Sequence, residues 1–162
     1  MILVTLGSNR SGPWGSPSET LGRALIELDR NEVKLESASR LIVSSPFGKQ
    51  DQPSFVNAVA VISTQLTPQA LMEKLHEIER SAGRRRNVRW GPRTLDLDLL
   101  DYNGVIQDEP GSLTLPHPGI AGRIFVLKPL AELAPSWIHP VLGETAAALL
   151  AKLDQAGEGA EI

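Results

Sequence analysis

The order in which two hydrophobic periodicities alternate along the chain restricts the fold more than any other feature of the sequence. Apolar or β-branched runs at residues 2–6, 35–43, 55–64 and 94–102 predict β-strands. Amphipathic segments that begin at Ser16 and Thr67 predict one helix after the first run and one after the third. The resulting strand-helix-strand-strand-helix-strand order is typical of an α+β fold, the ferredoxin-like split βαββαβ sandwich, with helices on one face of a mainly antiparallel sheet.

Local signals mark the ends of both predicted helices. Ser16-Pro17-Ser18-Glu19 supplies the hydroxyl, the first-turn proline and the reciprocal glutamate of a capping box. Thr67-Pro68 opens the second helix, and Gly83 stands where a left-handed residue would end it. Beyond residue 103 the sequence predicts a C-terminal extension, in which residues 125–133 and 144–153 form further helices.

Length and composition exclude several classes of protein. With 162 residues, 41% of them hydrophobic and 22% charged, the chain matches one globular domain. It has no apolar run near the roughly 20 residues that cross a bilayer and no basic flank typical of a signal peptide. The absence of cysteine excludes disulfides, and the net charge of −3 argues against general nucleic-acid binding. We therefore expect a single cytoplasmic domain over residues 1–162, with residues 155–162 frayed.

Two aspartates are the first candidates for chemistry. Asp96 and Asp98 lie two positions apart in the predicted strand at residues 94–102, so both carboxylates should project from one face. Two such carboxylates repel each other unless a cation lies between them, and Mg²⁺ favours hard oxygen ligands together with substrate phosphates. A solvent-facing strand with two acids that bind nothing would show the same isolated pattern.

An arginine cluster directly upstream favours the metal-nucleotide interpretation. Residues 80–93 contain no acid, and they include Arg84, Arg85, Arg86, Arg89 and Arg93. The planar guanidinium matches phosphate oxygens and stays charged, so arginines beside paired carboxylates suit a polyphosphate with its metals. A solvated basic loop or an RNA contact is the alternative, although RNA recognition usually adds exposed aromatic residues. The sequence contains no P-loop motif, so metals and arginines would have to hold the phosphates.

Residues 89–100, Arg-Trp-Gly-Pro-Arg-Thr-Leu-Asp-Leu-Asp-Leu-Leu, closely resemble the signature of the 6-hydroxymethyl-7,8-dihydropterin pyrophosphokinase family. Further segments follow the family's order and approximate spacing: Leu6-Gly7-Ser8-Asn9, Gln50-Asp51-Gln52-Pro53 with Phe55 and Asn57, and Leu115-Pro116-His117 with Arg123 and Phe125. The resemblance covers about residues 3 to 138. It implies transfer of the β,γ-diphosphate of ATP to 6-hydroxymethyl-7,8-dihydropterin, which yields the pterin diphosphate and AMP in folate biosynthesis.

The resemblance also implies roles for individual residues. Asp96 and Asp98 would hold two Mg²⁺ ions, and Arg84 and Arg93 would be catalytic. The implied ATP-binding positions are His76, Glu79, Arg84, Arg86, Trp90, Arg93, Leu99, Thr114, His117 and Arg123. The implied pterin-binding positions are Ser44, Phe47, Phe55, Asn57 and Phe125. Phe55 and Phe125 would stack on the pterin ring, and Asn57 would hydrogen-bond to its amide edge.

Several of these positions have an ordinary structural alternative. His76 and Glu79 could equally be solvated on the second helix, and Phe55 and Phe125 could pack in the core. Ser112 stands where the family often has an arginine, and Pro118 stands where an aromatic residue commonly follows the histidine.

Two other functions are compatible with the residues alone. The chain could be a non-catalytic nucleic-acid or nucleotide-binding module on the same scaffold, or a kinase or nucleotidyltransferase that acts on another acceptor. The product of ATP turnover separates these enzymes, since a kinase releases ADP and a nucleotidyltransferase releases diphosphate. We expect ATP and the pterin as partners, no nucleic acid, no membrane and a monomeric protein.

Overall fold

The computed structural model shows strands and helices in the predicted order. It describes residues 1–44, 54–84, 93–109, 111 and 113–155. The elements are β1 (Ile2–Ser8), α1 (Pro17–Leu28), β2 (Val33–Ala38), β3 (Ile42–Ser44), β4 (Phe55–Thr64), α2 (Pro68–Ser81), β5 (Asp96–Tyr102), the 3₁₀ turn η1 (Ile120–Gly122), α3 (Ile124–Leu133) and α4 (Ala146–Gln155). No helix in these described ranges is long and apolar enough to cross a membrane.

The strands form one antiparallel sheet with β1 near its centre. The order is β2-β4-β1-β5, and β3 also pairs with β4. The sequence predicted a single strand at residues 35–43, whereas the structure divides this segment into β2 and β3. Ser39 stays attached to β4 at the break, because its main-chain N–H donates to the Val59 carbonyl at 2.8 Å and its hydroxyl accepts from the Val59 N–H at 2.9 Å.

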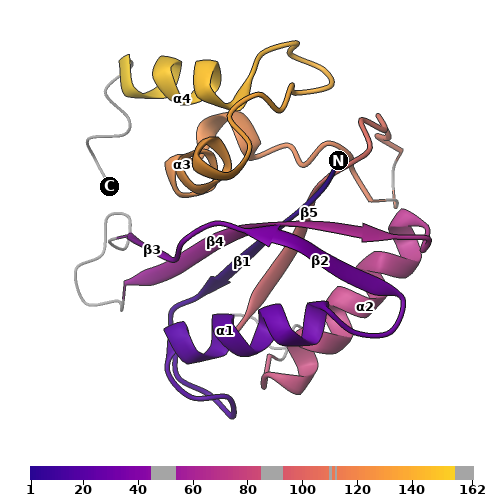
Figure 1. The fold of residues 1–162 in the computed structure, drawn as a ribbon, viewed down its shortest axis with the longest axis vertical. Coiled ribbons are helices and arrows are strands. Elements are labelled where there is room, and N and C mark those ends of the chain that lie inside the picture. Colours follow the sequence, from indigo (N-terminus) through magenta and orange to yellow (C-terminus); the bar gives the residue numbers. More distant parts are fainter. Residues whose placement is uncertain (45–53, 85–92, 110, 112, 156–162) are drawn as a thin grey trace.

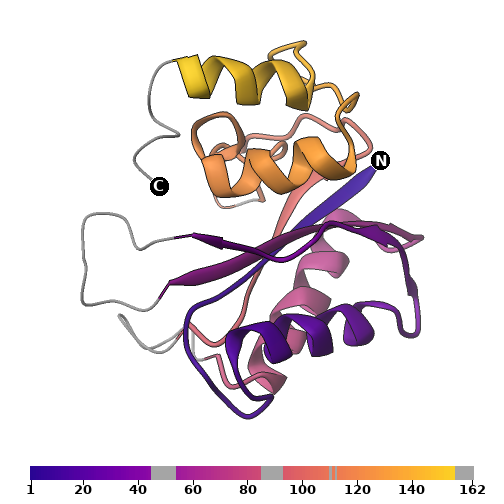
Figure 2. The same cartoon turned by 60° about the vertical axis from the view of Figure 1, so that its left-hand side comes forward.

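Helices cover both faces of this sheet (Figures 1 and 2). Helices α1 and α2 lie on one face, as predicted, while α3 lies on the other and α4 packs outside α3. The prediction that helices occupy one face is therefore correct for the βαββαβ core and incomplete for the extension. The second covered face has its own apolar residues, since Leu3, Val59 and Leu100 are buried with Leu127 of α3.

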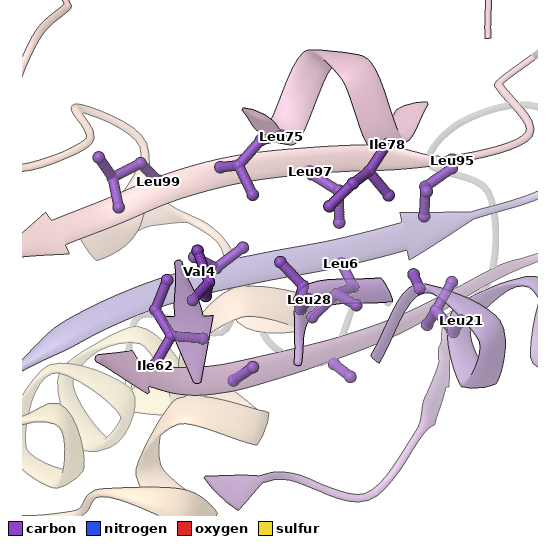
Figure 3. Close-up of a cluster of buried hydrophobic side chains, with 14 of the residues drawn as sticks. Val4, Leu6, Leu21, Leu28, Ile62, Leu75, Ile78, Leu95, Leu97 and Leu99 are labelled. Carbon is purple, nitrogen blue, oxygen red and sulfur yellow. The ribbon is translucent and has the colours of Figure 1, made fainter. Parts of the chain in front are cut away.

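The alternation in β5 directs its side chains to the two faces as the sequence predicted. Leu95, Leu97 and Leu99 are buried against the α1 and α2 side, next to Val4 and Leu6 of β1 (Figure 3). Asp96 and Asp98 consequently project toward the face that carries α3. The strand thus contributes to the core with one face and offers carboxylates on the other.

The predicted helix signals are present in the structure. Ser16 and Glu19 form the capping box of α1, and the Thr67 hydroxyl accepts from the Ala70 N–H at the start of α2. Gly83 has a φ of +92°, and a Cβ atom there would stand 2.7 Å from Pro13. Glycine therefore permits the sharp exit from α2 that brings Arg84 beside β5.

Candidate active site

Asn57, the candidate for pterin recognition, and Asp96, a candidate metal ligand, lie in one row of paired residues across the sheet. Gly7 of β1 pairs with Asn57 of β4 on one side and with Asp96 of β5 on the other. Neighbouring strands lie about 4.8 Å apart, so the backbones of Asn57 and Asp96 are separated by roughly 10 Å. A Cβ atom at residue 7 would stand 3.1 Å from Oδ1 of Asn57, so glycine gives the Asn57 amide room to lie across β1.

The carboxylate of Asp96 lies between two predicted catalytic arginines. Arg84 forms an ion pair with Asp96, and Nη1 of Arg93 lies 3.5 Å from its Oδ2 atom. The Arg84 side chain is only 12% exposed, whereas that of Arg93 is 57% exposed. The site thus supplies concentrated positive charge beside the aspartates, as phosphate binding requires.

Asp98 lies near His117. The pKa of His117 is lowered mainly by burial, while Asp98 acts to raise it and Arg123 to lower it, so His117 is within electrostatic reach of both charged groups. The His117 N–H donates to the Leu100 carbonyl at 2.8 Å, which fixes the loop beside β5. Because Nδ1 accepts from the Gly119 N–H at 3.0 Å, the proton of the neutral ring resides on Nε2, where it can be donated to an anion.

The Arg123 guanidinium lies directly over the backbone of Gly119. A Cβ atom at residue 119 would stand 2.7 Å from Nε of Arg123, so the missing side chain makes room for this cation. Arg123 itself is exposed and precedes α3. Arg123, at the start of α3, is therefore a second basic group close to His117.

The pterin-side candidates come from β3, β4 and α3. Asn57 is buried, with 8% of its surface exposed, and Phe55 and Phe125 are half-buried. Phe125 packs against the cluster beneath α3, so its core alternative is correct in part. Ser44 pairs with Phe55 at the end of the β3–β4 ladder. Phe47 lies outside the described residues.

The predicted adenosine-lining positions divide into half-buried and buried groups. His76 and Thr114 are half-buried. The Leu99 side chain is 1% exposed and lies in the core on the opposite face from Asp98, so only its main chain could contact a nucleotide. Glu79 is completely buried, which contradicts a solvated position for this residue. Arg86 and Trp90 lie outside the described residues.

The donor set fits Mg²⁺ that is bound together with a nucleotide. The described residues contain no group of three or more histidine, aspartate or glutamate side chains able to hold a metal alone. Mg²⁺ is commonly bound by one or two carboxylates, with phosphate oxygens and water as further ligands, and Asp96 and Asp98 supply such a pair. The Arg84 guanidinium beside Asp96 shows that this carboxylate is already compensated by a cation.

Sequence reasoning missed contributions that depend on strand register and burial. Gly7 was recognised as part of a motif, but its place between Asn57 and Asp96 depends on which strands flank β1. Asn9 and Thr94 were assigned no role, yet Oδ1 of Asn9 and Oγ1 of Thr94 are buried and lack a hydrogen-bond partner within the described part of the chain. Both lie in segments that resemble family motifs, but the sequence does not show that these side chains are buried.

Comparison with known proteins gives consistent matches across this region. The model of the 7,8-dihydro-6-hydroxymethylpterin-pyrophosphokinase (HPPK) family matches residues 3–135. The chain is 45% identical over 135 residues to the 2-amino-4-hydroxy-6-hydroxymethyldihydropteridine pyrophosphokinase of Pseudomonas aeruginosa, covering 83% of this chain and 80% of that protein. It is 44% identical over 139 residues to the protein of the same name from Haemophilus influenzae, covering 85% and 83% of the two chains.

A solved structure is similar in fold. The crystal structure of a Plasmodium falciparum HPPK-DHPS triple mutant superposes with a TM-score of 0.75 and 15% identity. The match covers 99% of this chain and 44% of that one, so the chain spans less than half of the length of that protein. At this identity the likeness shows the fold.

Proposed function

The chain belongs to the HPPK family, and from this premise we propose that ATP and the pterin meet on the α3 face of the sheet, around the row Asn57, Gly7 and Asp96. The protein is a 6-hydroxymethyl-7,8-dihydropterin pyrophosphokinase of folate biosynthesis. The register of β1 carries the proposal, because it aligns the candidate for pterin recognition with the candidate for metal binding.

On the nucleotide side, Asp96 and Asp98 are the proposed ligands of two Mg²⁺ ions. The family generally uses Mg²⁺, which when bound neutralises phosphate charge and polarises phosphoryl oxygens. Arg84 and Arg93 hold the phosphates and stabilise charge that develops during transfer. His117 donates from Nε2, and Arg123 supplies a further cation. The remaining proposed nucleotide contacts are His76, Arg86, Trp90, Thr114 and the main chain of Leu99.

The Arg84 guanidinium interacts both with the Asp96 carboxylate and, in this proposal, with a phosphate of ATP. Its ion pair with Asp96 keeps the guanidinium at the site before ATP arrives. A phosphate oxygen offers the same charge-assisted hydrogen bonds, so the arginine can contact it with little movement. Pre-positioning of this kind reduces the conformational freedom lost when the substrate binds.

On the pterin side, Asn57 recognises the amide and amino edge of the ring. Its buried amide carries both donors and an acceptor, which match the hydrogen-bonding groups on that edge of the ring. Phe55 and Phe125 contribute ring faces for stacking, and Ser44 and Phe47 bound the same pocket. The pterin hydroxymethyl oxygen then attacks the β-phosphorus in line, and AMP leaves. Transfer of this type depends on positioning and electrostatics rather than on a strong base.

The wider organisation is also part of the proposal. One domain over residues 1–162 is supported by the packing of α3 against β4 on the same sheet as the βαββαβ core. A cytoplasmic location agrees with the absence of cysteine. A monomer is the oligomeric state in this proposal.

Metal stoichiometry tests the proposed site. Calorimetric titration of Mg²⁺ into the protein with a nonhydrolysable ATP analogue should give two ions per site. Asp98→Asn should weaken at least one of them, because it replaces a charged ligand with a neutral amide. Thr5→Val, which changes the β1 residue opposite Asp98 without removing a carboxylate, is the matched control. Unchanged Mg²⁺ binding in Asp98→Asn would contradict the ligand assignment.

A further inference from the structure

Glu79 connects helix α2 to the strand that carries the two aspartates. Its side chain is completely buried, and Oε2 accepts the main-chain N–H of Leu97 at 2.7 Å. Leu97 stands between Asp96 and Asp98 in β5. Burying a carboxylate costs free energy unless the carboxylate is hydrogen-bonded. This short charge-assisted bond to the strand therefore offsets part of the cost of burying Glu79.

The bond from Glu79 supplies a hydrogen-bond partner to the outer edge of β5 at Leu97. In the described part of the chain, β5 pairs with β1 alone, so the main-chain groups on its other edge lack a strand partner. Main-chain groups alternate between the two edges of an antiparallel strand. Since the Leu97 N–H points outward to Glu79, the main-chain groups of the flanking residues Asp96 and Asp98 turn inward, toward Gly7 and Thr5.

The backbone of Glu79 also fixes the first catalytic arginine. Its carbonyl accepts the Arg84 N–H at 3.0 Å, and the Arg84 side chain pairs with Asp96. Figure 3 shows Leu75 and Ile78 of α2 beside the leucines of β5, so the helix turn that carries Glu79 is packed on the strand. One residue therefore links the exit of α2, the arginine and the segment that holds both carboxylates.

We propose that Glu79 is a positioning residue for diphosphate transfer, which fixes β5 at Leu97 and thereby sets the placement of Asp96 and Asp98 relative to Arg84. This inference rests on the proposed role of the two aspartates as metal ligands. It replaces an adenosine contact for Glu79, since a fully buried carboxylate that is bonded to the strand is directed into the protein. A displacement of about 1 Å at a catalytic group can cost 100-fold in rate, so an anchor at this point affects catalysis without contacting a substrate.

Three variants separate positioning from general stability. Glu79→Leu keeps the bulk in the buried site but lacks an oxygen acceptor, whereas Glu79→Gln retains an acceptor for the Leu97 N–H. Leu71→Ala is the matched control, because Leu71 is also fully buried on α2 and its side chain offers β5 no hydrogen bond. Amide hydrogen exchange, calorimetry with Mg²⁺ and a nonhydrolysable ATP analogue, pterin binding and steady-state kinetics are measured for each.

Glu79→Leu should accelerate exchange of the Leu97 amide while the Asp98 amide, bonded to β1, stays protected. It should lower kcat about 100-fold and weaken Mg²⁺ binding with the nucleotide analogue, while pterin affinity is retained. Glu79→Gln should restore most of these properties, and Leu71→Ala should lower stability with kcat retained.

Two results would overturn the inference. One is a loss of kcat in Glu79→Leu no larger than that in Leu71→Ala, and the other is a raised KM for ATP with unchanged kcat and a protected Leu97 amide. Asp98→Asn is measured alongside, because full activity in that variant would remove the ligand assignment and this inference with it. If Asp98→Asn is inactive and Glu79→Leu is normal, only the anchoring role is wrong.

Discussion

At the scale of single residues, the two aspartates differ in what compensates their charge. Asp96 lies between Arg84 and Arg93, whereas Asp98 lies near His117. Removing either carboxylate should reduce metal binding, but the two losses should have different effects on folding. An arginine that is 12% exposed depends on its anion more than a solvated group does.

Asp96→Asn should therefore destabilise the protein more than Asp98→Asn. We expect about 1 to 2 kcal/mol for Asp96→Asn, because the ion pair between Arg84 and Asp96 is lost, and less than about 0.5 kcal/mol for Asp98→Asn. Urea unfolding of both variants without nucleotide measures the difference. Equal stabilities would show that the Arg84–Asp96 ion pair contributes nothing to the fold.

Recognition of the pterin should depend on Asn57 more than on the aromatic residues. Asn57→Ala leaves polar groups of the ring edge unpaired, at a cost of about 1 to 3 kcal/mol, whereas stacking discriminates little between flat rings. Calorimetry with a nonhydrolysable ATP analogue should show that Asn57→Ala weakens the dihydropterin more than analogues without the amide edge, while Phe125→Ala weakens both alike. If Asn57→Ala discriminates as the wild type does, the pterin site lies elsewhere.

The sequence alone predicted the orientation of side chains where the local pattern is strong. The alternation of leucines with Asp96 and Asp98 predicted which side chains share a face, and the structure confirms it. The burial of Glu79 was not predictable in this way. A glutamate near the end of an amphipathic helix is usually solvated, and only the packing of α2 on the edge strand shows that its partner is the Leu97 N–H.

At the scale of elements, the loop between α3 and α4 depends on a neutral histidine. Nδ1 of His139 accepts the Val141 and Leu142 N–H groups, each at 3.1 Å. Burial lowers the pKa of His139, while Asp101 opposes this shift. Nearby, the Trp137 indole donates to Asp101 at 2.8 Å and its ring meets that of His139 edge-on, so the loop is tied to the end of β5.

Stability should consequently decrease as the solution becomes more acidic. A histidine whose pKa is lower in the folded state binds more protons when unfolded, so its contribution is present above the unfolded pKa of about 6.5 and is lost as pH falls through the folded value. Urea unfolding between pH 7.5 and 5 should show this loss, and His139→Asn should reduce its slope. His117, whose pKa is lowered too, accounts for part of the remaining slope. Identical slopes in the variant and the wild type would contradict the role of His139.

The elements also show where local patterns stop being informative. Capping residues and periodicity predicted α1 and α2 closely, because those signals lie within each helix. The division of residues 35–43 into β2 and β3 depends on Ser39 bonding to Val59, a contact between segments distant in sequence. A run rich in apolar residues does not reveal such an interruption.

At the scale of the whole molecule, the C-terminal extension covers the second face of the sheet with α3 and, outside it, α4 (Figures 1 and 2). The order of elements along the chain predicted the mainly antiparallel sheet, but it did not predict that the second face is covered. The signal for this covering was present in Leu3, Val59 and Leu100, apolar residues on the face opposite the first core. The same face carries Asn57, Asp96 and Asp98, and α3, which buries apolar surface there, carries Phe125, the proposed stacking residue.

The fate of the ATP phosphates tests the central claim most directly. Phosphorus NMR of a reaction with ATP, Mg²⁺ and 6-hydroxymethyl-7,8-dihydropterin should show one AMP and one pterin diphosphate for each ATP consumed, with no free diphosphate. Asp98→Asn, run beside the wild type, should slow this turnover by about 100-fold or more, because charge on the transferring phosphates is less well compensated. Formation of ADP or of free diphosphate would contradict transfer of the β,γ-diphosphate. Full turnover in Asp98→Asn would contradict transfer at a site formed by Asp96 and Asp98.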